Sequence, residues 1–309
     1  MWVIKYRKFF YLLSGFALLA SLAAMIFFGL NFGIDFKGGT IVELNYTGTR
    51  PAIDDIRAAV NKLNLGTVSV QPTGDQGLVM RLRTITNDEK NTLIQAAALN
   101  ATSSVVEKQF SSIGPSLGAE LAQKAIIAIS LVSLLIILFI TFAFRGVSRP
   151  VSSWKYGLIA IATLVHDLLI PTGVFAYLGA IHGTEIDALF LTALLTILGL
   201  SVNDTIVVFD RIRENLKLKI SPHFEETVGI SLSQTFTRSI NTSLTVILAL
   251  LALYFFGGET TRDFALALTI GMIVGTYSSI FIASPLLVTW NKFSEKHVSN
   301  KGKKFLDES

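Results

Sequence analysis

The chain has 309 residues, of which 51% are hydrophobic and only 16% are charged. This composition is too apolar for a water-soluble protein of that length and indicates several membrane-spanning segments. The sequence contains no cysteine, which excludes disulfide bonds and cysteine-ligated metals. The formal net charge is +4, and the placement of the basic residues says more than this total.

Six apolar runs are long enough to cross a bilayer, which takes about 20 residues of helix. They are residues 9–30, 125–144, 156–181, 188–209, 235–256 and 264–290. The first follows Lys5, Arg7 and Lys8, as a signal peptide would. Its uncharged length exceeds the apolar core of about 7–15 residues that signal peptides carry, so we expect a retained anchor.

Basic residues predict the orientation of these spans, because Lys and Arg concentrate in cytosolic segments. The segments before the first span, between spans 2 and 3, between spans 4 and 5, and after the sixth are basic, whereas 182–187 and 257–263 are short and acidic or balanced. We therefore expect both termini in the cytosol and residues 31–122 outside. Interface-anchoring tryptophans fall at the predicted cytosolic boundary: Trp2, Trp154 and Trp290.

The expected division is a first helix within 1–30, an external domain at 31–122, five helices within 123–291, and a cytosolic tail at 292–309. In the external segment, strands are predicted at 40–46, 67–72, 77–85 and 103–110, and helices at 51–63 and 87–99. Asn87 is the expected cap of the second helix. The order βαββαβ predicts a ferredoxin-like α+β domain. It carries no catalytic constellation, which favours a mechanical or binding role.

Glycine-rich stretches join this domain to the membrane at 33–39 and 114–121. They serve either as turns, because glycine adopts conformations that other residues resist, or as a pair of hinges. The candidate hinge residues are Gly33, Asp35, Gly38, Gly39, Gly114 and Pro115.

Four ionisable residues fall inside the predicted spans: His166, Asp167, Asp204 and Arg238. Each costs at least about 2.5–3.5 kcal/mol near the bilayer centre, so such groups usually face protein or water and pair. Asp204 and Arg238 lie on neighbouring antiparallel spans and are expected to form either a static ion pair or a proton relay. His166 and Asp167 are expected to form a structural pair or an accessory relay. Polar residues beside them are further candidates: Asn203, Thr205 and Asn241.

Helical spacing gathers further polar and small residues into stripes. Span 5 carries one stripe: Thr235, Arg238, Asn241, Thr242 and Thr245. Span 4 carries another: Thr192, Thr196, Gly199 and Asn203. Small residues at every fourth position of span 6 predict close helix packing: Ala267, Gly271, Gly275, Ser279 and Ala283. Residues 222–236, capped by Ser221, are expected to form an amphipathic helix on the cytosolic surface.

Five motifs together resemble one family: GIDFKGG (33–39), GPSLGAEL (114–121), SVNDTIVVFDRIREN (201–215), TRSINTS (237–243) and FALALTIGMIVGTYSSIFIASPLL (264–287). They are similar to SecF, the bacterial protein-export membrane subunit of the SecD/SecF family, over residues 5–292. SecD shares the six-span plan but has a larger external region and Asp-Ala-Asn in place of Asn-Asp-Thr.

The resemblance implies a subunit of the bacterial inner membrane that pairs with SecD in a complex related to resistance-nodulation-division transporters. It implies association with the SecYEG translocon, with YajC and YidC as further candidate partners, and use of the proton-motive force to export unfolded preproteins. Some relatives are thought to use sodium, so the ion stays open. The family's membrane aspartate and arginine fall on Asp204 and Arg238, which favours the relay.

Two other functions were weighed against this one. The chain could instead be half of a proton-coupled efflux transporter for small molecules, which would have the same six membrane spans. Its external domain of about 90 residues is small for a drug-binding domain. An intramembrane enzyme is disfavoured because HExxH, GxSxG and phosphate-loop motifs are absent. No cofactor, metal or nucleic acid is expected.

Overall fold

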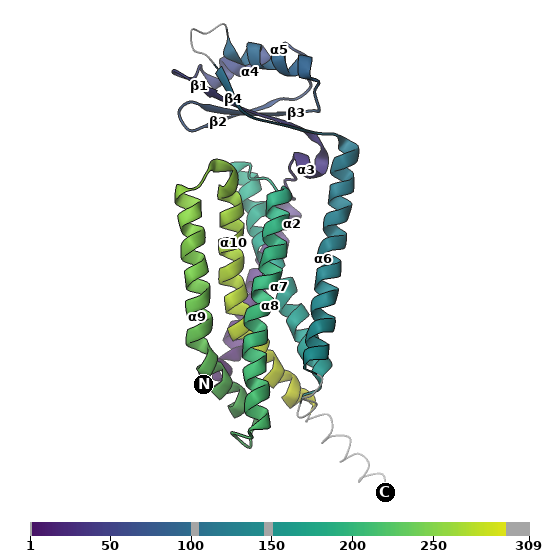
Figure 1. Ribbon diagram of the computed structural model, residues 1–309, viewed down its shortest axis with the longest axis vertical. Coiled ribbons are helices and arrows are strands. Elements are labelled where there is room, and N and C mark those ends of the chain that lie inside the picture. Colours follow the sequence, from purple (N-terminus) through teal and green to yellow (C-terminus); the bar gives the residue numbers. More distant parts are fainter. Residues whose placement is uncertain (1, 100–104, 145–150, 295–309) are drawn as a thin grey trace. The chain divides into compact units, whose positions relative to one another are not determined.

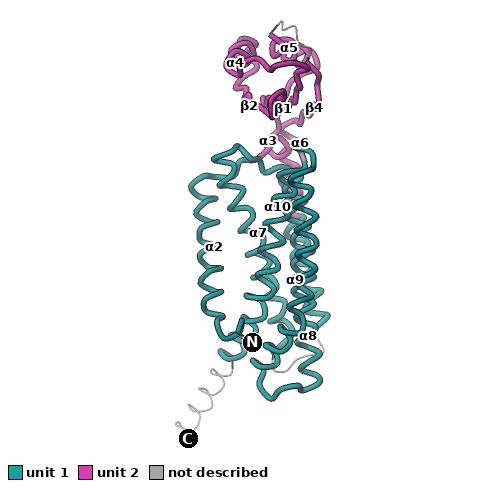
Figure 2. Tube along the Cα trace, turned by 90° about the vertical axis from the view of Figure 1, so that its left-hand side faces the viewer, with its two compact units in different colours: residues 1–31, 128–309 teal, residues 32–127 magenta. Residues whose placement is uncertain are grey.

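The structure is a computed structural model that describes residues 2–99, 105–144 and 151–294. The chain divides into two compact units, residues 1–31 with 128–309, and residues 32–127 (Figure 2). Three expectations from the sequence lie outside the described residues. They are the basic residues Arg145 and Arg149, the start of the predicted strand at 103, and the lysine-rich tail from 295 onward.

Six helices of the described chain are long and apolar enough to cross a membrane, which confirms the six predicted spans. They are α2 (Arg7–Phe28), α6 (Pro115–Ala143), α7 (Ser153–His182), α8 (Ala188–Lys217), α9 (Phe224–Phe256) and α10 (Glu259–Ser278) (Figure 1). A short helix, α1 (Trp2–Lys5), precedes them. After α10 the chain makes a π-helical segment, η1 (Ser279–Ala283), and returns to α-helix over 284–294.

The prediction of a separate surface helix at 222–236 is wrong. These residues are the first turns of α9, which runs without a break from Phe224 and has His223, not Ser221, at its N-cap position. Val228 and Leu232 are fully buried in the apolar core of the helical unit. The apolar positions at every fourth residue therefore face other helices, and the spacing alone does not separate that face from a membrane-facing one.

Small residues set how closely the helices of this unit approach one another. A Cβ atom added to Gly271 would lie 2.1 Å from Ile197 Cδ1, and one added to Gly275 would lie 3.0 Å from Ser201 Cβ. The five small residues of the span 6 stripe are all buried, so the predicted packing face of α10 and η1 is confirmed. A similar contact joins α2 to α7, where a Cβ on Gly173 would lie 2.4 Å from Ser21 Cβ.

Ionic and aromatic contacts join the starts of α2, α7 and α9 to the helical residues 284–294. Glu225 accepts from Arg7 at 2.7 Å and also pairs with Lys292. The rings of Trp154 and Trp290 meet edge to face at 5.6 Å. The first turn of α9 is thereby tied to both ends of the described chain.

The described part of the second unit contains one antiparallel sheet, two helices that pack together, α4 and α5, and the short helix α3 (Figure 1). Its strands are β1 (Gly39–Tyr46), β2 (Ser69–Thr73), β3 (Gly77–Leu82) and β4 (Val105–Ile113), in the order β2-β3-β1-β4. Its helices are α3 (Ile34–Lys37), α4 (Ile53–Asn61) and α5 (Asn87–Ala98). From β1 to β4 the order βαββαβ is as predicted.

Alternate residues of the sheet and one face of each helix form the core of this unit. Val42 lies opposite Met80 on β3 and Phe110 on β4. Ile56 of α4 and Leu93 of α5 are fully buried in the same cluster. The alternation that predicted the strands is therefore the pattern of burial, because successive side chains point to opposite faces of a sheet.

Thr86, not Asn87, caps α5, so that prediction is wrong by one residue. Thr86 Oγ1 accepts from the backbone N–H of Glu89 at 3.3 Å, and Glu89 Oε2 accepts from the backbone N–H of Thr86 at 2.9 Å. This reciprocal capping box needs an acid three residues after the cap, which only Thr86 has. Hydrogen bonds from Arg83 and from the backbone of Thr86 lower the pKa of Glu89 to about 2.

The two glycine-rich junctions pack against each other, backbone to backbone. Gly38 and Gly39 have φ of +76° and +136°, where side chains are strained. A Cβ on Gly38 would lie 2.7 Å from Pro115 Cα, and one on Gly118 would lie 2.8 Å from the backbone nitrogen of Gly38. The glycines are thus required by conformation and by close approach; the proposed hinge motion stays a prediction.

Replacing Thr86 by alanine should weaken α5 by about 1 kcal/mol, because the backbone N–H of Glu89 loses its capping partner, Thr86 Oγ1. Asn87→Ala, at the exposed first helical residue, is the matched control and should change stability by less than about 0.5 kcal/mol. Hydrogen exchange of the α5 amides in the intact chain measures both. Equal effects of the two substitutions would contradict the cap identified here.

Gly38→Ala should destabilise the 32–127 unit by more than Gly66→Ala does. Gly66 has a comparable φ of +82° but nothing within 4 Å of an added Cβ, so its substitution reports the conformational strain of about 1–2 kcal/mol alone. At Gly38 the backbone of Pro115 has to move as well. Hydrogen exchange of β1 and β4 compares the two; equal losses would show that close packing is unimportant.

Candidate functional site

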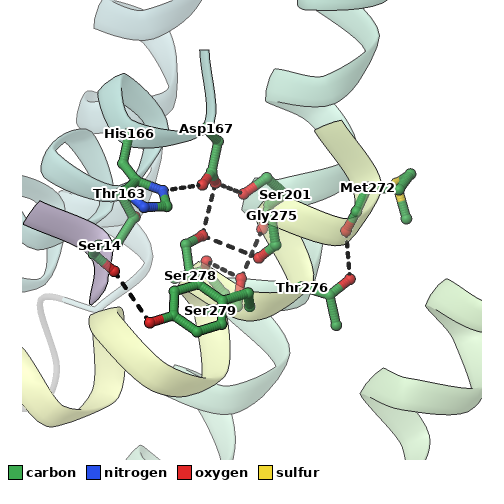
Figure 3. Close-up of polar contacts among 12 residues, drawn as sticks. Ser14, Thr163, His166, Asp167, Ser201, Met272, Gly275, Thr276, Ser278 and Ser279 are labelled. Atoms are coloured by element: carbon green, nitrogen blue, oxygen red, sulfur yellow. Dashed lines mark hydrogen bonds and ion pairs between the residues drawn. The ribbon is translucent and has the colours of Figure 1, made fainter. Parts of the chain in front are cut away.

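Asp167 on α7 is completely buried, and three side chains hydrogen-bond to its carboxylate (Figure 3). His166 Nδ1 lies 2.9 Å from Oδ1, and Ser278 Oγ donates to Oδ2 at 2.8 Å. Ser201 Oγ of α8 donates to the same Oδ2. Because Ser278 belongs to α10, one carboxylate connects three helices through short side chains.

The π-helical segment η1 begins beside this carboxylate. Ser279 Oγ lies 2.8 Å from Thr205 Oγ1 and 3.4 Å from the backbone oxygen of Ser201. Segments of π-helix within α-helices are frequent at functional sites, where the extra residue per turn re-aims side chains. Here Ser278 and Ser279 point to different partners, one to the carboxylate on α7 and one to α8.

Asp204 on α8 forms a second buried carboxylate centre. Its side chain is 8% exposed, and Ser243 Oγ of α9 lies 3.2 Å from Oδ2. Thr276 Oγ1 of α10 lies 2.6 Å from Ser243 Oγ. Ser243 Oγ is also 2.9 Å from the backbone oxygen of Ser239, so its single hydrogen has two competing acceptors.

Three residues of α8 spaced by three and four make these contacts. Ser201, Asp204 and Thr205 lie on adjoining faces of one turn and reach α7, α9 and η1 respectively. Within the described part of the chain no side-chain hydrogen bond links the Asp167 network to that of Asp204. The two centres therefore both include residues of α8, but no continuous chain of side-chain hydrogen bonds joins them in the described residues.

The expected contact between Asp204 and Arg238 is absent from this structure. Arg238 is exposed on α9 and forms no ion pair within the described ranges, and Ser243 lies beside Asp204 instead. Residues 238 and 243 are five apart, so they point from different faces of the helix. The roles in ion coupling proposed for Asp204 and Arg238 stay predictions.

Some of the other candidate residues lie in the interior of the helical unit and others lie on its surface. His166, Asp167 and Thr205 are buried in the networks, whereas Asn203 and Asn241 are exposed. The exposed set continues along α8 and α9: Thr192, Thr196, Gly199, Asn203, Arg238, Asn241, Thr242 and Thr245. In a lone chain, polar side chains of both membrane helices thus face outward.

Sequence reasoning missed the serine and threonine side chains that hold the two carboxylates. They are Ser201, Ser243, Thr276 and Ser278. The spacing of Thr235, Ser239 and Ser243 by fours was a usable signal, since all three are buried on one face of α9. Hydropathy does not reveal it, because such hydroxyls also satisfy themselves on carbonyls of their own helix.

The chemistry available to this arrangement is uptake and release of a small cation by buried carboxylates. Neither Asp167 nor Asp204 forms an ion pair with a lysine or arginine of the described segments. No cluster of three His, Asp or Glu side chains able to hold a metal occurs in the residues described.

Comparison with known proteins identifies the family. Residues 94–293 match the family described as Protein export membrane protein SecD/SecF, C-terminal, and residues 23–49 match the SecD/SecF GG Motif. The chain is 46% identical over 300 residues to Protein translocase subunit SecF of Thermobaculum terrenum, covering 93% of each chain. It is 40% identical to that of Anaerolinea thermophila, covering 98% of each.

A solved structure has the same fold over most of this chain. The crystal structure of SecDF from Thermus thermophilus, described as a translocon-associated membrane protein, aligns with a TM-score of 0.80 at 32% identity. The alignment covers 94% of this chain but only 38% of that one, so the chain spans well under half of the SecDF polypeptide. With six apolar helices and these relatives, the chain is a multi-pass membrane protein and belongs to the SecD/SecF family, with the protein translocase subunits SecF as its relatives.

Proposed function

We propose that this chain pairs with SecD, associates with the SecYEG translocon, and uses an ion gradient to promote export of unfolded preproteins across the bacterial cytoplasmic membrane. The observation that carries the proposal is the buried Asp204 carboxylate, which has one hydroxyl partner, Ser243, but no basic partner among the described residues. Such a group takes up a proton when it is enclosed and releases one when a cation or water approaches.

The exposed polar residues of α8 and α9 support the pairing with SecD. Asn203 adjoins Asp204 and Thr242 adjoins Ser243, so these exposed positions lie at the depth of the carboxylate. Arg238 and Asn241 extend the polar surface along α9. Facing lipid, such groups cost free energy, and a second six-helix half covers them with polar or small side chains.

Coupling follows if α9 has two arrangements against α8. In the structure Ser243 faces Asp204, and a turn of α9 about its axis would bring Arg238 toward it instead. A proton crossing about 150 mV supplies about 3–4 kcal/mol, which shifts a two-state equilibrium a few hundredfold. The arrangement with the arginine close favours the ionised carboxylate and therefore proton release.

The 32–127 unit is proposed to act outside the membrane, with both chain termini in the cytosol, as the basic segments predict. Its glycine junctions are proposed to transmit motion from the helices. YajC, YidC and the preprotein are further proposed partners. A coupling ion other than the proton, sodium above all, is compatible with an oxygen-lined carboxylate.

Asp204→Asn should abolish ion flux and the stimulation of export while leaving assembly with SecD intact, because the amide keeps the shape but cannot bind a proton. Asp210→Asn on the same helix is the control: Asp210 is exposed and paired with Arg213 outside the network, so its loss should leave flux unchanged. Flux is measured in reconstituted vesicles with proton and sodium gradients varied separately. Normal pH-dependent flux in Asp204→Asn would exclude the role assigned to this residue.

Single cysteines at Thr196 and Thr245 should cross-link to SecD, since both are exposed on the polar faces assigned to the partner. The chain has no native cysteine, so each product reports one position. A cysteine at Leu135, exposed on the strongly apolar α6, is the control and should react only slowly. Cross-linking from Leu135 but from neither threonine would place the partner elsewhere and contradict the proposed interface.

A further inference from the structure

His166 on α7 is 97% enclosed, and only one of its two ring nitrogens has a hydrogen-bond partner. It is 3% exposed, and Nδ1 lies 2.9 Å from Asp167 Oδ1. Nε2 is buried and has no hydrogen-bond partner among the residues that the structure describes, and Figure 3 draws no contact to it. The unpartnered atom is a buried polar atom that Asp167 cannot reach.

The surroundings of Asp167 decide which nitrogen carries the hydrogen. Oδ2 already accepts from Ser201 and Ser278, so the carboxylate is held as an acceptor by two hydroxyl donors. An acceptor at Oδ1 requires the hydrogen of neutral His166 on Nδ1, which leaves a lone pair on Nε2. With the opposite tautomer, Nε2 would bear a buried N–H without an acceptor, which costs about 1–3 kcal/mol.

The neighbouring hydroxyls of Thr163 and Tyr277 donate elsewhere and not to this lone pair. Thr163, one turn earlier on α7, donates within its own helix, to the backbone oxygen of Ala160 at 2.8 Å. The Tyr277 hydroxyl donates to the backbone oxygen of Phe10 at 3.0 Å, while its ring stacks on the imidazole with centroids 6.3 Å apart. The lone pair therefore has no hydrogen-bond donor among the described residues.

We propose that Nε2 of His166 is a second proton-accepting atom of the membrane unit, with Asp167 fixing its tautomer and balancing the charge of the imidazolium. The proton comes from water on the high-proton side, adds to Nε2, and returns to water on the other side; no bond other than N–H forms or breaks. The pair then alternates between net charges of −1 and 0. This inference rests on the proposed ion coupling and adds a site to it.

Two titratable groups contact the imidazole, Asp167 on α7 and Tyr277 on α10. On α8, Ser201 contacts Asp167, whereas the titratable Asp204, one turn on, contacts Ser243 of α9. On α2, Tyr11 pairs with Thr289, and Ser14 supplies a hydroxyl to Tyr277. No lysine or arginine in the part of the chain that is described ion-pairs with this group, so nothing cationic opposes protonation.

The substitution that tests the proposal is His166→Asn. The asparagine amide N–H can replace Nδ1–H as donor to Asp167, whereas nothing replaces the basic Nε2. His182→Asn on the same helix, at an exposed residue, is the matched control. Each variant is purified with SecD, checked for assembly, and reconstituted in lipid vesicles. A pH-sensitive dye inside the vesicles reports proton flux.

We expect His166→Asn to assemble normally and to lose proton flux down to the rate of protein-free vesicles, and His182→Asn to keep the wild-type rate. Flux retained by His166→Asn but lost in Asp204→Asn would overturn this inference while the proposed function stands. Wild-type flux in both variants would overturn both. If His166→Asn failed to assemble, magnetic resonance of the unmodified chain would test the proposal instead.

Magnetic resonance of isotope-labelled histidine in the unmodified chain tests the atom itself, independently of transport. The chain has only four histidines, so their ring nitrogens can be resolved. We expect His166 to be the Nδ1–H tautomer before the sample is acidified and to carry a second proton, on Nε2, afterwards. A ring that keeps one tautomer and stays neutral after acidification would overturn the proposal.

Discussion

Ser201 and Ser278 donate to one carboxylate oxygen of Asp167, and the arrangement of the helical unit depends on that shared acceptor. Serine side chains are short, so α8 and α10 must approach α7 closely to reach it. Glycine at 271 and 275 permits the approach of α10 to α8, since any Cβ there would meet Ile197 or Ser201. The hydrogen bonds to Asp167 and the contacts of the small residues therefore both require short distances between these helices.

The second carboxylate is held less firmly, and its surroundings fit a group that changes state. Asp204 has a single hydroxyl partner, and that partner, Ser243, has a backbone oxygen as an alternative acceptor. Asp167 by contrast is fully buried and held by three donors. Asp167 is thus held in one geometry, whereas Asp204 can exchange its partner, as the proposed ion coupling requires.

The 32–127 unit shows a different use of glycine. At Gly38 the positive φ and the contact with Pro115 both exclude a side chain, so the junction is a packed structure rather than a loose linker. Motion transmitted through it is proposed to move the packed segments 33–39 and 114–118 together. The Thr86 cap and the buried Leu93 hold α5 on the same unit.

Much of this architecture was predictable from the sequence, and for identifiable reasons. The six membrane helices follow from long apolar runs, since the bilayer requires about 20 residues per crossing. The sheet of the 32–127 unit follows from alternation in β1 and β3, because one face of a sheet is buried. The positions of His166, Asp167 and Asp204 stand out because a charged residue within an apolar helix is costly.

Only the tertiary structure decided which residues of different helices contact each other. Spacing placed Arg238 on a helix next to Asp204, but the rotation of α9 puts Ser243 there and leaves the arginine exposed. Residues 224–236 are the first turns of α9 rather than a surface helix, and the reciprocal hydrogen bonds with Glu89 make Thr86, not Asn87, the cap of α5. A sequence determines which residues share a face of one helix, because the period is local. Which face meets which neighbour depends on how all the helices pack at once, and short hydroxyls that hydropathy ignores settle it.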